Sequence, residues 1–75
     1  MQFQVVTRKT YEGFDAAVPS IRECDSWAHT EDEAIERLLE RVRFFLDLEE
    51  GRKHSLDVLR KEDGETYYTL TIRDR

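Results

Sequence analysis

Few side chains in this sequence could carry metal or nucleophilic chemistry, and most of them lie in the stretch "AAVPSIRECDSWAHTEDEA", residues 16–34. Cys24, the only cysteine, is followed by Asp25 and His29. Zinc sites usually pair ligands at short spacing, as in Cys-x-x-Cys with His-x-x-x-His, and no such pairing occurs here. If residues 24–28 are extended, Cys24 and His29 point to opposite faces. The sequence therefore predicts no metal and no cofactor.

A nuclease is the sharper enzymatic hypothesis. Two-metal phosphodiester cleavage needs several carboxylates that converge on one point. Asp15 and Asp25 could share the solvent face of a sheet, but most other acidic residues belong to the outer face of a predicted helix. No Ser-His-Asp arrangement and no glycine loop for phosphate is visible. We expect no enzymatic activity and keep a nuclease-like enzyme as the second alternative.

The lone thiol is expected to pack rather than react. A reactive cysteine needs an exposed, electropositive setting. The neighbours Glu23 and Asp25 would instead raise the pKa of Cys24, so a small buried apolar role is favoured. A single cysteine cannot form a disulfide within the chain, which fits a reducing compartment.

Length and charge narrow the class of protein. The 75 residues predict one domain over residues 1–75, and a domain this short is marginally stable. Twelve Lys and Arg against 17 Asp and Glu give a net charge of -5. This sign argues against direct nucleic-acid binding and favours a basic protein partner, with simple solubility as the alternative. No membrane span or signal peptide is apparent, so we expect a cytoplasmic protein.

The first 28 residues predict three strands. Residues 2–6 and 14–18 alternate in polarity on either side of Gly13, which indicates a hairpin. Pro19 cannot donate a hydrogen bond to a neighbouring strand, so the second strand should end there. A short third strand is predicted over residues 25–28.

A long helix follows. Thr30 and Glu33 form a capping-box pattern in which the hydroxyl accepts an amide and the carboxylate returns to the cap. Apolar residues then recur at helical spacing, and Gly51 is a natural end, so the helix is predicted over residues 31–50. Phe44 and Leu48 fall outside the apolar stripe. Either the helix is buried over a wide arc, or its last two turns touch something else.

The C-terminal part completes an α+β fold. Residues 55–61 read as a strand or as a helical turn, "EDGE" indicates a hairpin, and residues 66–73 form a clear strand. The arrangement of residues 52–63 stays open. We predict a three-stranded antiparallel sheet with the helix packed on one face, followed by one or two C-terminal strands, in the order β-β-β-α-β(β).

Residues 11–48, about half of the chain, resemble the HicB-like antitoxin domain. The resemblance rests on "Gly-Phe-Asp-Ala-Ala-Val-Pro", on an Ile and a Cys at fixed spacing after the proline, and on "Thr-Glu-Asp-Glu-Ala" at the helix start. The chain has Glu23 and Ala28 where the family usually has glycine, and Asp32 and Glu33 supply its acidic helix start. Glycine permits backbone angles that Glu and Ala resist.

The resemblance implies a partly RNase H-like fold without nuclease activity. It implies a protein that neutralises a small, basic, mRNA-cleaving toxin of the HicA type by covering it, as a homodimer. The DNA-binding segment of many family members is not expected here. The alternative is a solitary HicB-like domain of regulatory or structural role that acts as a homo-oligomer.

A contact surface is predicted on the side of the sheet opposite the helix. Trp27 should lie on the face opposite Cys24, together with Val6, Ala17 and Tyr67, and such aromatic patches often mark partner or dimer contacts. The alternative is that Trp27 folds over the sheet edge as part of the core. On the helix, Glu36 and Glu40 are candidates for contact with a basic partner.

Overall fold

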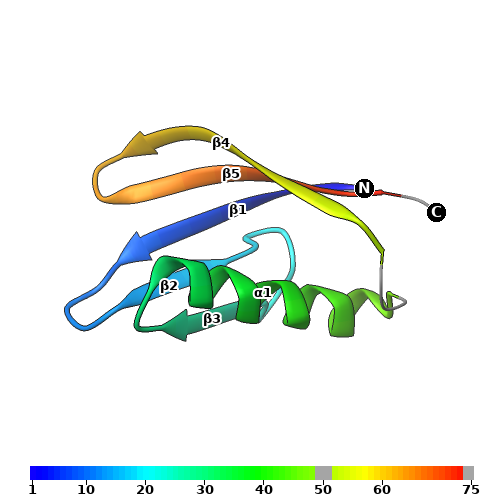
Figure 1. Cartoon of the computed structure of the whole chain (residues 1–75), viewed down its shortest axis with the longest axis horizontal. Helices are drawn as coiled ribbons and strands as arrows, with labels where there is room; N and C mark the ends of the chain where they lie inside the picture. Colours follow the sequence, from blue (N-terminus) through cyan, green and yellow to red (C-terminus); the bar gives the residue numbers. More distant parts are fainter. Residues whose placement is uncertain (49–51, 74–75) are drawn as a thin grey trace.

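The computed structural model of the chain describes residues 1–48 and 52–73 and shows one sheet with one helix packed against one of its faces (Figure 1). The elements are β1 (Gln2–Lys9), β2 (Phe14–Ala17), β3 (Asp25–Ala28), α1 (Glu31–Leu46), β4 (His54–Glu62) and β5 (Glu65–Ile72). The strand order is β3-β2-β1-β5-β4, and every neighbouring pair is antiparallel. The predicted α+β class is confirmed.

The predicted three-stranded sheet is wrong, because β5 joins the same sheet beside β1. The pairing runs from Gln2 opposite Thr71 to Arg8 opposite Glu65. It continues at the chain end, where the Met1 ammonium donates to the Ile72 carbonyl at 3.0 Å. A strand with a free edge exposes a row of unpaired backbone groups. The C-terminal hairpin satisfies that edge of β1, and β1 becomes the central strand.

The segment that the sequence left open is a strand. Residues 54–62 form β4, and the predicted "EDGE" turn joins it to β5. Asp63 and Gly64 have φ of 50° and 79°, the left-handed backbone that a two-residue type I′ hairpin turn requires at both positions. The pairing shifts between Val58 and Arg60, which places a bulge in this edge strand.

Helix α1 begins where the capping pattern predicts and ends earlier than predicted. Thr30 Oγ1 accepts from the Glu33 amide at 3.2 Å, the first of the two predicted cap bonds. The helix ends at Leu46 because Asp47 turns into the left-handed region, with φ of 52°. The Leu48 amide then donates to the Arg43 carbonyl at 2.9 Å, which closes the last turn. The predicted end at Gly51, with residues 49–50, lies outside the described residues.

One face of the sheet packs against α1, and the core lies between them. Helix α1 contacts β3, β2 and β1. The five strands span about 19 Å, whereas a helix with its side chains is about 10 Å across, so one helix leaves part of the sheet uncovered. The fully buried side chains on the helix side include Val5, Ala16, Leu38, Val42 and Leu70. We call the opposite side of the sheet the outer face.

A buried polar cluster joins the helix start to the sheet, and the sequence did not indicate it. Buried Thr7 donates from its hydroxyl to Glu31 Oε2 at 2.7 Å. Burial and a hydrogen bond to the Glu31 carboxylate raise the pKa of Tyr68 to about 12. The carboxylate at the first position of α1 thus binds hydroxyl groups from β1 and β5.

The loop between β2 and β3 is held by local backbone bonds. The Val18 amide donates to the Cys24 carbonyl at 3.0 Å, and the Cys24 amide donates to Ile21 at 3.2 Å. Glu23, between them, has φ of 61°. A residue with a Cβ pays about 1–2 kcal/mol in the left-handed region, which glycine occupies freely.

Substitution of Glu23 by glycine should therefore stabilise the protein. We expect Glu23→Gly to raise the free energy of unfolding by about 0.5–1 kcal/mol, after the entropy that glycine adds to the unfolded chain. Urea unfolding measures the change. Arg22→Gly is the matched control, since Arg22 is exposed and lacks the positive φ, and it should give no gain. A loss of stability in Glu23→Gly would contradict the strain argument.

Candidate interaction surfaces

The strand register builds rows of side chains on the outer face. Val6 pairs with Ala17 on one side and with Tyr67 on the other. The row continues to Asp25 in β3 and to Arg60 in β4. Residues paired across strands share a face, so these five side chains cross the whole sheet. The structure thus brings Val6, Ala17 and Tyr67 together as an apolar row with one charged residue at each end.

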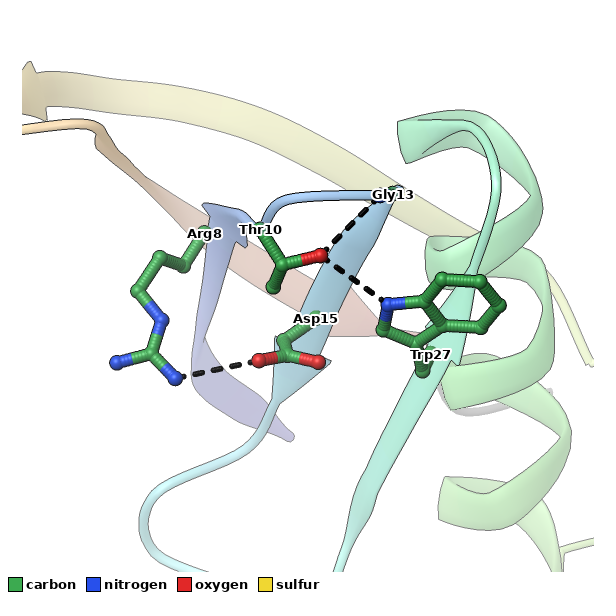
Figure 2. Close-up of polar contacts among 5 residues, drawn as sticks. All are labelled: Arg8, Thr10, Gly13, Asp15 and Trp27. Carbon is green, nitrogen blue, oxygen red and sulfur yellow. Dashed lines mark hydrogen bonds and ion pairs between the residues drawn. The ribbon is translucent and has the colours of Figure 1, made fainter.

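A second, mostly charged row runs beside the first. It consists of Trp27, Asp15, Arg8, Glu65 and Glu62, each paired with the next across the five strands. Arg8 donates to Asp15 Oδ2 at 3.2 Å (Figure 2). The ion pair separates Trp27 from Glu65 and Glu62 within this second row. Trp27 therefore lies on the outer face, but in the row beside the apolar one.

Tyr67 is held in place by its neighbours. Its hydroxyl donates to Glu65 Oε1 at 3.0 Å, and the Arg60 guanidinium lies 4.1 Å from the centre of its ring. The hydrogen bond to the Glu65 carboxylate is the main reason that the pKa of Tyr67 is raised. A ring fixed before binding loses little side-chain entropy on contact.

The apolar row lies in a shallow groove with acidic surroundings. The groove measures about 400 Å³ and is lined by Gln4, Val6, Arg8, Asp15, Ala16, Ala17, Pro19, Glu65 and Tyr67. Acidic residues on the outer face, given by the register, are Asp15, Asp25, Asp57, Glu62 and Glu65; the basic ones are Arg8 and Arg60. This excess of carboxylates makes the surface complementary to a basic partner.

Trp27 covers the end of the sheet beside the turn between β1 and β2. Its indole nitrogen donates to Thr10 Oγ1 at 3.2 Å, and the Gly13 amide donates to the same oxygen at 3.1 Å (Figure 2). The ring meets His29 edge-on, with centroids 4.8 Å apart, and remains 38% exposed. Trp27 is therefore outside the core and anchored by polar contacts at the sheet end.

A second hollow, which we call the edge groove, lies between β3 and α1. It measures about 580 Å³ and is lined by Ser26, Trp27, Arg37, Glu40, Arg41, Phe44 and Phe45. Arg37 Nη1 donates to the Trp27 carbonyl at 3.0 Å, so the helix blocks one acceptor on the free edge of β3. Of the two predicted helix contacts, Glu40 lines this groove, whereas Glu36 is exposed on the helix and does not line it.

The residues first considered for chemistry form no metal-binding cluster in the part of the chain that the structure describes. Cys24 is 2% exposed, and burial raises its pKa, with a smaller opposing effect from Arg41. His29 is exposed. Across residues 1–48 and 52–73, no group of three or more His, Cys, Asp or Glu side chains could hold a metal ion.

Comparisons of the chain with protein-family models, with curated proteins and with solved structures found no match. The resemblance to the HicB-like domain stays a prediction from the sequence. In the part of the chain that the structure describes, no helix is long and apolar enough to cross a bilayer.

Gly13 allows the close approach of Trp27. A Cβ built at Gly13 would lie 2.2 Å from the Ala28 carbonyl oxygen and 2.7 Å from Cζ2 of Trp27. Gly13→Ala should therefore lower the free energy of unfolding by about 1–3 kcal/mol and shift the indole fluorescence, because the ring must move. Thermal unfolding and emission spectra measure both effects.

The control is Gly64→Asn, since a Cβ at Gly64 meets no atom within 4 Å and Asn tolerates a positive φ. Gly64→Asn should lower the free energy of unfolding by less than about 1 kcal/mol and leave the emission spectrum unchanged. An equal cost at the two glycines would mean that Trp27 does not pack over Gly13.

Proposed function

We propose that this chain is a non-catalytic protein-binding module that docks a basic partner protein on its outer face. One observation carries the proposal. The apolar row of Val6, Ala17 and Tyr67 crosses a sheet face that no described element covers, and carboxylates outnumber basic side chains on that face. A small apolar centre with a charged rim is the usual composition of a protein contact.

The outer face suits a protein better than a nucleic acid. Phosphate backbones need clustered Lys and Arg, whereas this face has an excess of carboxylates, and Arg8 and Arg60 are already paired with Asp15 and Glu62. The Arg60–Glu62 pair is 3.0 Å long and the Arg8–Asp15 pair is 3.2 Å long. The same pairing of Asp15 weakens the nuclease alternative, because an ion-paired carboxylate is a poor ligand for a catalytic metal.

The specific form of the proposal is a HicB-like antitoxin that covers a small, basic, mRNA-cleaving toxin of the HicA type. The motif from Gly13 to the helix start supports it. The left-handed backbone at Glu23 also supports it, because the family usually has glycine at this position. Ala28 occupies the second position at which the family usually has glycine, and it lies buried in β3. A solitary HicB-like domain that acts as a homo-oligomer is the alternative.

Binding to a small basic protein encoded beside this gene tests the proposal. We expect a complex whose affinity falls as salt rises, because opposite charges are screened. Tyr67→Ser should weaken binding by about tenfold or more in calorimetric titration, since a fixed aromatic ring at the centre of a contact is a typical hot spot.

Val58→Ser is the matched control. Val58 is 59% exposed, but it pairs with Tyr68 and therefore lies on the helix side of the sheet. It should change affinity by less than about threefold. Equal losses in the two variants, or a complex that only Val58→Ser weakens, would contradict docking on the outer face.

A further inference from the structure

Phe44 is a large apolar side chain that does not pack in the core. It lies near the C-terminal end of α1, is 81% exposed, and meets only the edge of the Phe45 ring among aromatic contacts of the described residues. The sequence had already placed it outside the apolar stripe. It lines the edge groove together with Trp27, which is 38% exposed. An exposed phenyl ring next to an aromatic hollow marks a contact surface.

The charges beside Phe44 have a regular order. Four residues of α1 share one face of the helix, because they are spaced three, four or seven positions apart, except for one adjacent pair. They are Arg37, the adjacent Glu40 and Arg41, and Phe44. The distance along the axis from Arg37 to Phe44 is about 10.5 Å, or two turns. The two basic residues and the acidic residue of this face all line the edge groove.

We infer that two copies of the chain associate through this face, with their α1 helices antiparallel about a two-fold axis between positions 40 and 41. In that arrangement Glu40 of each copy faces Arg41 of the other. Arg37 of each copy faces Phe44 of the other, so each phenyl ring enters the opposite edge groove beside Trp27. One surface supplies both the protruding ring and the hollow, as a two-fold contact requires.

Charge complementarity selects the second copy and its direction. In a parallel pair each residue would face itself, and Arg37, Glu40 and Arg41 would each meet a like charge. The antiparallel pair replaces these repulsions with two opposite-charge contacts and two contacts between a guanidinium and an aromatic face. A partner whose surface carries a single sign of charge would be repelled by either the basic or the acidic residues of this face. A second copy of the chain carries both signs in the complementary order.

This association does not depend on the proposed function. Helix α1 and the apolar row of Val6, Ala17 and Tyr67 lie on opposite sides of the sheet, so a dimer joined through α1 leaves both apolar rows open, and Trp27 is the outer-face residue that borders the contact. The contact also differs from the dimer surface predicted from the sequence, in which Trp27, Tyr67, Val6 and Ala17 would meet a second copy. Of these four residues, Trp27 alone lines the edge groove.

The mass in solution over a range of concentrations tests the inference. Sedimentation equilibrium should show a monomer–dimer equilibrium for the unaltered chain. Phe44→Ser should raise the dimer dissociation constant by about thirtyfold or more, because each substitution removes two buried rings from one dimer. Tyr67→Ser should leave the constant within about twofold.

A charge exchange tests the direction of the helices. Glu40→Arg alone and Arg41→Glu alone should each weaken the dimer by about tenfold, since each creates two like-charge contacts. The double variant Glu40→Arg with Arg41→Glu should restore the dimer, because every contact is again between opposite charges. Both residues are exposed, and circular dichroism checks that each variant is folded.

Three results would overturn the inference. They are a monomer at every concentration, a dimer that Tyr67→Ser weakens and Phe44→Ser does not, and a double charge exchange as weak as the single ones. Partner binding that Tyr67→Ser leaves unchanged, together with a dimer that Phe44→Ser weakens, would contradict the proposed function and leave this inference standing, so the two failures are distinguishable.

Discussion

The pairing of β1 on both of its edges is the constraint on which the rest of the structure depends. Side chains alternate along a strand, so a slip of one residue would move every side chain of β1 to the other face. The register of β1 with β2 and β5 places Val5 under the helix and Val6 on the outer face. The same register aligns Ala17 and Tyr67 with Val6, and so builds the apolar row.

The small size of the chain explains why it has surfaces to offer. A single helix cannot cover five strands, and the core is correspondingly small. No described element covers the outer face, so the apolar row remains accessible there. The edge groove, with Phe44, remains accessible on the flank of α1 beside β3. The proposed function uses the first of these surfaces, and the inferred dimer uses the second.

Local patterns predicted the local structure, and long-range pairing escaped them. Polarity alternation predicted the first two strands, and the Thr30 cap predicted the helix start, because each depends on neighbouring residues. The β1–β5 pairing joins segments about 60 residues apart and could not be derived from alternation alone. The Arg8–Asp15 ion pair follows from the β1–β2 register, and the edge groove follows from the placement of α1 beside β3, so no sequence signal indicated them. The early helix end required a left-handed Asp47, for which Gly51 was the more obvious candidate.

The most direct measurement is nuclear magnetic resonance of the isolated chain with a soluble paramagnetic probe, which broadens the signals of exposed groups. It compares the methyl signals of two pairs of adjacent residues, Val5 with Val6 and Ala16 with Ala17. Val5 and Ala16 are fully buried beneath α1, whereas Val6 and Ala17 line the groove of the outer face. The account predicts strong broadening of the Val6 and Ala17 methyl signals and little at Val5 and Ala16. Equal protection at the two members of each pair would contradict an uncovered outer face and the register that builds it.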